Sequence, residues 1–109
     1  MRNEELLIRL TQTQGIAGYE KKVRELIEEE VRPYADELIV DPLGSLIAVK
    51  KGKGGPRSKK IMFAAHMDEI GFMVKKIEED GRLLVCNVGW NWTASAYNTR
   101  VVFRNGIYG

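Results

Sequence analysis

The spacing of apolar positions along the chain predicts two helices at its beginning. Residues 3–10 carry leucines along one side, and Asn3 can cap this helix ahead of two glutamates that suit its first turn. Residues 11–18 contain two glycines and are typical of a loop. A second helix is predicted over residues 19–32, and Pro33 marks its end. The apolar positions of this second helix follow helical spacing at Tyr19, Val23, Leu26, Ile27 and Val31.

Short apolar runs after Pro33 predict β-strands joined by tight turns. These strands are expected over residues 38–40, 45–50, 61–65, 70–77, 82–88 and 100–104. Turn chemistry joins them at Asp41-Pro42-Leu43-Gly44, at Glu79-Asp80-Gly81-Arg82 and at Asn105-Gly106. The arm that returns after Gly106 is very short, which predicts an unpaired strand edge there.

The loop of residues 51–60 is rich in Gly and Lys, a composition shared with phosphate-binding loops. No Gly-Lys-Ser/Thr pattern closes it. We therefore interpret it as a solvated hairpin loop rather than a phosphate site.

The stretch of residues 61–71 contains the strongest candidate for a functional site. Residues 61–65 form a short apolar run with the length of a buried strand. The only histidine of the chain, His66, comes next, and Asp68 follows two positions later. Because side chains alternate along an extended backbone, His66 and Asp68 are expected to point to the same side, and Glu69 to point away. In open α/β sheets ligands collect at the carboxyl ends of the strands, where this pair would lie.

Composition narrows the class of protein. A chain of 109 residues holds one small domain or part of a larger one. Its 17 basic and 15 acidic residues nearly balance, so we expect no nucleic-acid partner. No stretch approaches the apolar length that spans a bilayer, so we expect no membrane partner. Cys86 is the single cysteine and no secretory signal is visible, which makes a cytoplasmic location the default.

His66 and Asp68 together could form part of a metal site. Imidazole nitrogen is a good ligand for zinc or cobalt, and a carboxylate can be a second ligand or the partner that orients the ring. A lone His-x-Asp pattern is a weak signal of a metal site, and taken by itself it favours a structural histidine. A catalytic zinc usually has three protein ligands, and the remaining acids are more simply assigned to helix surfaces and turns. The chain taken alone therefore supplies a first ligand and its orienting partner, not a complete active site.

Other chemistries have weaker support. The serines lie in no nucleophile-elbow pattern. Cys86 lies in the middle of a predicted strand and is interpreted as a buried, inert thiol. The aromatic residues Trp90, Trp92 and Tyr97 could stack on a sugar or a base, or could serve the core or a subunit contact.

Four stretches carry a family resemblance. They are Gly15-Ile16-Ala17-Gly18-Tyr19-Glu20, Asp41-Pro42-Leu43-Gly44-Ser45-Leu46, Ala64-Ala65-His66-Met67-Asp68-Glu69-Ile70-Gly71 and Val88-Gly89-Trp90. In order and spacing they resemble the dinuclear metallo-aminopeptidases that build tetrahedral shells, which include glutamyl and deblocking aminopeptidases and members with an endoglucanase label. The resemblance covers residues 3–90 and fades from Asn91 onward. Ser45 stands where the family more often has Asn.

The resemblance implies an α/β fold class. Residues 1–69 would be the N-terminal part of an α/β/α zinc-peptidase-like catalytic domain, and residues 70–109 the incomplete beginning of an inserted, β-barrel-like dimerisation domain. His66 would be a metal ligand, and Asp68 the catalytic acid that orients it and helps set the acidity of the metal. The family uses two divalent ions, zinc or cobalt, and forms homo-oligomers. Its other ligands and its general-base glutamate come after the inserted domain and have no counterpart among these residues.

We therefore expect a truncated form or N-terminal fragment of a metal-dependent aminopeptidase, a hydrolase that removes N-terminal residues from peptides and is inactive in this short form. An alternative is a non-catalytic oligomerisation or interaction module, driven by exposed edges after Ile70 together with Trp90 and Trp92. A further alternative is an endoglucanase-type glycoside hydrolase. Such enzymes need two carboxylates that flank a cleft, and no convincing pair is visible in the sequence.

Overall fold

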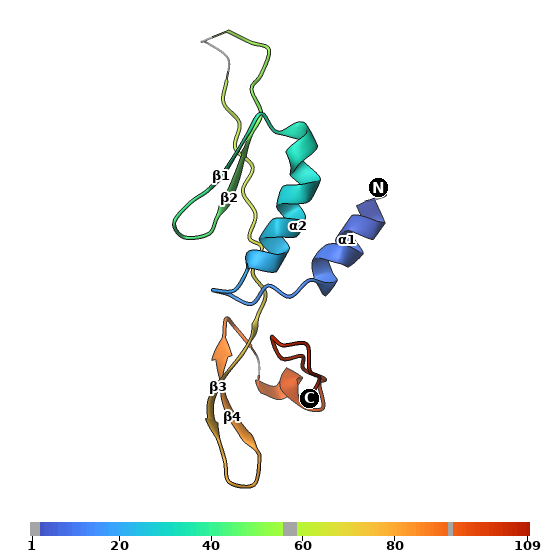
Figure 1. The fold of residues 1–109 in the computed structure, drawn as a ribbon, viewed down its shortest axis with the longest axis vertical. Helices are drawn as coiled ribbons and strands as arrows, with labels where there is room; N and C mark the ends of the chain where they lie inside the picture. Colours follow the sequence, from blue (N-terminus) through green and yellow to red (C-terminus); the bar gives the residue numbers. More distant parts are fainter. Residues whose placement is uncertain (1–2, 56–58, 92) are drawn as a thin grey trace. The chain divides into compact units, whose positions relative to one another are not determined.

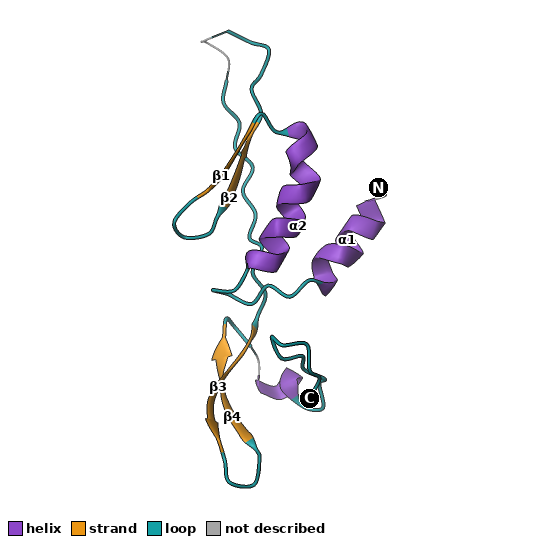
Figure 2. Ribbon diagram, viewed as in Figure 1, coloured by secondary structure: helices purple, strands orange, loops and turns teal. Residues whose placement is uncertain are grey.

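The computed structural model describes residues 3–91 and 93–109, apart from residues 56–58, and divides the chain into two compact units. The first unit comprises residues 1–15 and 20–67, and the second comprises residues 16–19 and 68–109 (Figure 1). Helices and strands are both present, which confirms the expected mixed α and β composition (Figure 2). None of the helices in the described part is long and apolar enough to cross a membrane.

Two helices form in the first unit where the apolar spacing predicts them. Helix α1 spans Asn3–Gln12 and carries Glu4 and Glu5 in its first turn, as expected. Helix α2 spans Lys21–Val31 and continues into a 3-10 turn, η1, at Arg32–Tyr34, where proline ends the regular helix. Helix α2 begins later than predicted because residues 16–19 form a β-turn instead.

The first hairpin of the structure pairs β1, Glu37–Val40, with β2, Leu46–Val49. Its turn has the predicted chemistry, because an oxygen of the Asp41 carboxylate accepts hydrogen bonds from the backbone amides of Leu43 at 2.9 Å and Ser45 at 2.8 Å. Helix α2 packs against β2, and Arg24 donates to the Gly44 carbonyl at 3.2 Å. The hairpin is thus attached to the helix at its turn.

The second unit contains a longer hairpin. Strand β3, Gly71–Ile77, pairs antiparallel with β4, Leu83–Val88, with an irregularity between Val74 and Lys76. Gly81 takes a φ of +85° in the connecting turn, a conformation that glycine adopts without steric cost. A 3-10 turn, η2, follows at Thr93–Ala96.

The predicted strand over residues 61–65 is wrong. This segment has no regular secondary structure, and the exposed fractions of Ile61, Met62 and Phe63 are 79%, 87% and 93%. The pairing of the described strands explains why, since they form only two separate two-stranded hairpins. An extended segment without a neighbouring strand cannot pair its backbone amides and carbonyls, so its apolar side chains stay in contact with water.

The predicted strand over residues 100–104 is confirmed only in part. Val102 forms an isolated antiparallel bridge with Tyr108 around the expected Asn105-Gly106 turn. The backbone amides of Val101 and Gly109 also donate to each other's carbonyl oxygens. The arms are too short for a regular strand.

Very little of the described chain is buried. Val23 on α2 is the one apolar side chain among the described residues that is buried, with 5% of its surface exposed. The described part of the loop over residues 51–60 is exposed, as predicted, while residues 56–58 lie outside the described ranges. The stability of each unit therefore depends on helix formation, turn chemistry and a few close contacts more than on a large core.

The acid end of the pH range provides a test of the β1–β2 turn. The amide hydrogen bond from Ser45 holds the pKa of Asp41 below its ordinary value of 3.8. Ionised Asp41 therefore stabilises the turn above that value, and the stabilisation is lost as the pH falls below 3.8 through the lowered pKa. We expect the Leu43 and Ser45 amide resonances to report a loosening turn as the pH falls below 3.8.

In Asp41→Asn, which keeps an acceptor oxygen but does not titrate, this response of the turn should disappear. Asp36→Asn is the matched control, because Asp36 accepts from Lys51 at 2.6 Å at the other end of the same hairpin. It should leave the pH response of the turn unchanged. A turn that loosens equally in wild type and Asp41→Asn would contradict the assignment.

Candidate metal centre

His66 and Asp68 are both exposed in the structure. His66 lies near the end of the first unit, in the segment that follows the exposed residues 61–63, and Asp68 is the first residue of the long stretch of the second unit. The predicted same-side orientation of the two side chains stays a prediction, because the residues belong to different units.

The chain directly after Asp68 is held by backbone pairing. Glu69 forms a parallel bridge with Ile16, and strand β3 begins two residues later at Gly71. Sequence reasoning missed the role of Ile16, because a bridge between residues so far apart leaves no local pattern. The glycine-rich motif around Gly15 and Gly18 was the available signal.

The chain directly before Asp68 has a close contact within the first unit. A Cβ atom at Gly15 would lie 3.3 Å from the Met67 carbonyl oxygen and 2.8 Å from Cγ1 of Val23. Only a residue without a side chain fits at this distance. Gly15 is buried accordingly, next to the single buried apolar side chain of the described residues.

The donor atoms of His66 and Asp68 suit a divalent cation. Imidazole nitrogen and carboxylate oxygen are both common zinc ligands. Within the described residues, however, no group of three or more His, Cys, Asp or Glu side chains gathers where it could hold a metal ion. The residues therefore fit a metal as part of a donor set and do not complete one.

Two other aspartates have structural roles instead. Asp41 is the acceptor of the β1–β2 turn, which confirms its interpretation as a turn former rather than a ligand. The backbone amide of Lys51 donates to Asp36 at 2.6 Å and holds the pKa of that carboxyl below its ordinary value. Both carboxylates are thus engaged by local backbone amides.

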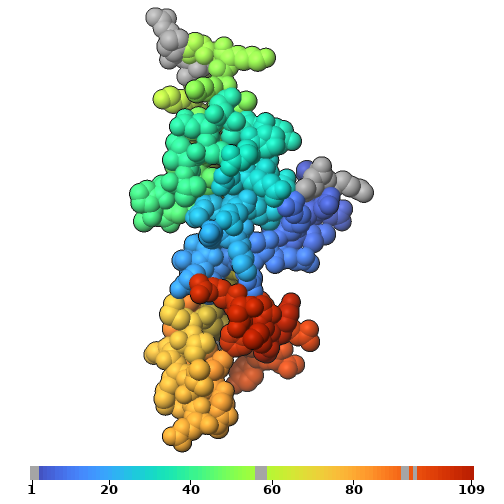
Figure 3. Space-filling view, viewed as in Figure 1, coloured from blue at the N-terminus to red at the C-terminus, as the bar shows by residue number. Residues whose placement is uncertain are grey.

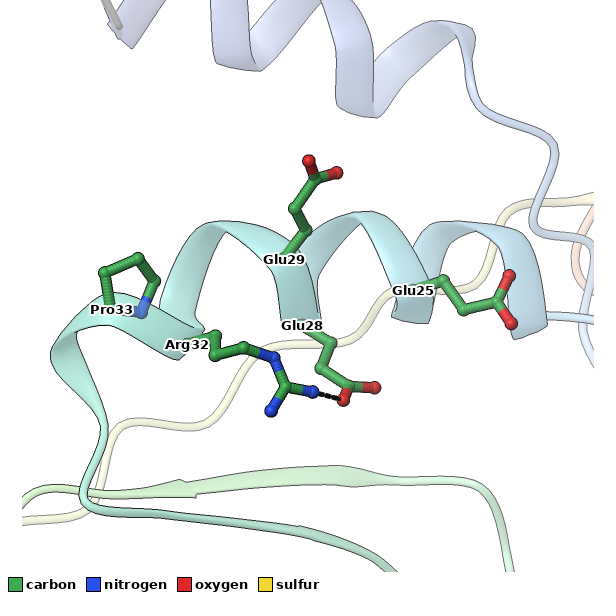
Figure 4. A pocket seen from close by; sticks show the side chains of 5 residues that line it. All are labelled: Glu25, Glu28, Glu29, Arg32 and Pro33. Atoms are coloured by element: carbon green, nitrogen blue, oxygen red, sulfur yellow. Dashed lines mark hydrogen bonds and ion pairs between the residues drawn. The ribbon is translucent and has the colours of Figure 1, made fainter.

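An open depression on helix α2 is lined by Glu25, Glu28, Glu29, Arg32 and Pro33 (Figure 4). Arg32 forms an ion pair with Glu28 across one turn of the helix, while Glu29 points away from them. These carboxylates come from successive turns of one helix and do not face one another across a cleft. The arrangement therefore lacks the flanking carboxylate pair of a glycoside hydrolase.

The aromatic candidates are exposed where they are described. Trp90 and Tyr97 are each 84% exposed, so neither fills the core of this chain, and Trp92 lies outside the described residues. Cys86 is half-buried, so the prediction of a buried thiol is wrong in degree. Tyr19, predicted on the apolar stripe of the second helix, instead precedes α2 and lies under the Arg104 guanidinium, whose carbon is 4.7 Å from the ring centre.

Comparison with known proteins connects this stretch to a family of peptidases. The model of the M42 glutamyl aminopeptidase family matches residues 44–108, a range that includes His66, Asp68 and both strands of the β3–β4 hairpin. The chain is 49% identical over 105 residues to a relative from Acetivibrio thermocellus. That alignment covers 96% of this chain and 31% of the relative, so the chain spans about a third of the length of the relative.

Two solved structures resemble the fold. An aminopeptidase from the archaeon Desulfurococcus kamchatkensis matches with a TM-score of 0.85 and 37% identity, over 95% of this chain and 29% of that protein. A TET aminopeptidase from a Thaumarchaeota archaeon of marine sediment matches with a TM-score of 0.74 and 38% identity, over 84% of this chain and 25% of that protein. Both alignments again cover less than a third of the longer protein.

The incomplete donor set predicts weak metal binding. One imidazole and one carboxylate cannot replace enough of the hydration shell of a cation, so we expect the 109-residue chain to bind zinc with a dissociation constant well above about 1 μM. His66→Ala should abolish this binding in calorimetry with zinc or cobalt. Glu79→Gln, which removes an exposed carboxylate in the β3–β4 turn, should leave it unchanged. Sub-micromolar binding by the monomer would contradict the assignment of an incomplete site.

Proposed function

Because the chain belongs to the M42 glutamyl aminopeptidase family, we propose that it is the N-terminal part of a metal-dependent aminopeptidase that removes N-terminal residues from peptides. The observation that carries the proposal is the His66-Met67-Asp68 sequence within the part of the chain that the family model matches. It supplies two donor side chains of the type that a divalent cation needs.

In the proposed enzyme His66 is a metal ligand, and Asp68 is the catalytic acid that holds the imidazole in its ligating orientation. A carboxylate next to a ligating imidazole fixes the ring and raises its basicity. The metal, zinc or cobalt, would supply Lewis-acid activation of the peptide carbonyl and of water. Further residues of the longer protein would supply the remaining ligands and would hold a second ion.

The proposed domain organisation assigns residues 1–69 to the catalytic domain and residues 70–109 to the beginning of an inserted β-rich dimerisation domain. The boundary between the two compact units, at Met67 and Asp68, lies close to this division and supports it. Further support comes from the exposed run of Ile61, Met62 and Phe63. Burying apolar surface stabilises a fold by about 25 cal/mol per Å², so a neighbouring strand of a larger domain would stabilise this segment as a strand.

Peptide substrates and a homo-oligomeric assembly are part of the same proposal. The similarity to a TET aminopeptidase supports both. Apolar side chains of the β3–β4 hairpin, such as Met73, Val74 and Leu84, are exposed and could be covered by a second copy. A cytoplasmic location is supported by the single cysteine, because paired cysteines mark many secreted proteins of this size.

The same exposed hairpin favours a second candidate function, a non-catalytic oligomerisation module. The two readings differ in the behaviour of the isolated chain. A module of this kind would form stable oligomers without further sequence, whereas an incomplete catalytic part would be a monomer or a heterogeneous aggregate. Light scattering distinguishes them, and a well-behaved monomer would count against the module.

We predict that the pure 109-residue chain does not hydrolyse an aminoacyl-nitroanilide at a measurable rate with zinc or cobalt. The reason is that its donor set is incomplete. The chain joined to its downstream reading frame should hydrolyse this substrate, and His66→Ala in that longer protein should reduce kcat/KM by at least about 100-fold. Glu79→Gln provides the matched control and should retain activity. Metal-dependent turnover by the short chain that is lost in His66→Ala would overturn the prediction.

A further inference from the structure

We infer that Ile16 is a positioning residue for Asp68, and that it acts through backbone pairing with Glu69 and side-chain packing on Gly71. The inference rests on the proposed metal site, and it assigns to the N-terminal glycine-rich motif a task that neither the motif nor the donor set reveals. The second unit contains Ile16, Asp68, Glu69 and Gly71, and their contacts lie within it.

Backbone pairing is the first contact. Ile16 forms a parallel bridge with Glu69, the residue that directly follows Asp68. A parallel bridge fixes both the direction of the two paired segments and the register of the paired residues. Asp68 is therefore one residue away from a fixed backbone position, although it belongs to no strand itself.

Side-chain packing is the second contact. A Cβ atom at Gly71 would lie 2.4 Å from Cδ1 and 3.0 Å from Cγ1 of Ile16, distances far shorter than van der Waals contact. The Ile16 side chain thus occupies the space that any other residue at position 71 would need. Gly71 also opens strand β3, so the contact fixes where the strand begins.

The turn that carries Ile16 is itself fixed. The Tyr19 amide donates to the Ile16 carbonyl at 2.8 Å, and Gly18 has a φ of +85°, the conformation of the third residue of a type II turn. The Tyr19 ring lies under the Arg104 guanidinium with 4.7 Å between the guanidinium carbon and the ring centre. Such a cation–π contact is favourable and helps to hold the Tyr19 ring in place.

These contacts have one consequence for chemistry. A carboxylate that orients a metal-bound imidazole must itself be held in place, and mutation of such partners lowers metal affinity about 10- to 100-fold. The side chain of Asp68 is exposed, and positions 69 and 71 hold the backbone that carries it, with Ile16 as their common partner.

A size exchange tests the contact. Gly71→Ala places a methyl group where the Ile16 side chain lies, and Ile16→Ala in the same chain removes the atoms that it meets, leaving the Ile16 Cβ at an ordinary 3.7 Å. The readout is the imidazole resonance of His66 during a titration with zinc chloride, which is free of overlap because the chain has one histidine. Gly55→Ala is the matched control, because no atom lies within 4 Å of its added methyl group.

We expect Gly71→Ala to weaken zinc binding at His66 about 10-fold, and the double variant Ile16→Ala/Gly71→Ala to recover it to within about 3-fold of wild type. Gly55→Ala should behave as wild type. Unchanged affinity in Gly71→Ala, or a loss that the double variant does not recover, would overturn the inference.

The variant Val85→Ala distinguishes a general loss of structure in the second unit from loss of the Ile16–Gly71 contact. Val85 pairs with Val74 in the middle of the β3–β4 hairpin, away from Asp68 in sequence. This variant should weaken the hairpin, measured by amide exchange, without changing the zinc affinity. If it weakens zinc binding as much as Gly71→Ala does, Ile16 has a structural role only and the positioning role is wrong.

Spectra recorded without zinc separate this inference from the proposed function. If wild-type His66 does not respond to zinc at all, the proposed metal site fails. The contact is then decided by the Asp68 and Glu69 amide resonances, which should shift in Gly71→Ala and return in the double variant. Resonances that stay shifted in the double variant would overturn the role of Ile16 as well.

Discussion

A shortage of buried apolar surface is the constraint that shapes the rest of this structure. Burial of apolar side chains is the dominant stabilising term in folding, and Val23 is the one apolar side chain that the described part of this chain buries. The first unit relies instead on two helices and a hairpin, the second on a hairpin, and both on a contact in which a glycine admits a close neighbour. Figure 3 draws the chain in space-filling form, coloured by sequence. The exposed run of Ile61, Met62 and Phe63 is the clearest consequence, because nothing within the described residues offers it a pairing partner.

Two glycines permit the closest packing contacts described in each unit. Gly15 packs against Val23 and the Met67 carbonyl in the first unit, and Gly71 packs against Ile16 in the second. In both places the approach is closer than any side chain would permit. These two contacts involve the residues on either side of Asp68 in sequence, so the glycine-rich motif near the N-terminus and the histidine-containing motif are structurally connected although they are far apart along the chain.

The described residues supply only part of a metal-binding donor set, and the chain matches only part of the length of its relatives. A metal centre capable of hydrolysis needs several ligands, and the described residues gather none in groups of three or more. The chain in turn spans 31% of the length of the Acetivibrio thermocellus relative. Membership of the M42 glutamyl aminopeptidase family therefore accounts for the motifs present in this chain.

The sequence by itself determined the elements whose stability is local. Helices α1 and α2, the Asp41 turn and the Gly81 and Gly106 turns form close to where the sequence predicts them, because helix periodicity and turn chemistry act between residues close in the chain. The motifs around His66 also indicated the family correctly. Tertiary structure alone decided the absence of a strand over residues 61–65, the place of Tyr19 under Arg104 and the contact of Ile16 with Gly71. Each of these depends on whether a distant partner is present, and hydrophobicity patterns report only that a segment could pair or pack, not what it would pair or pack with.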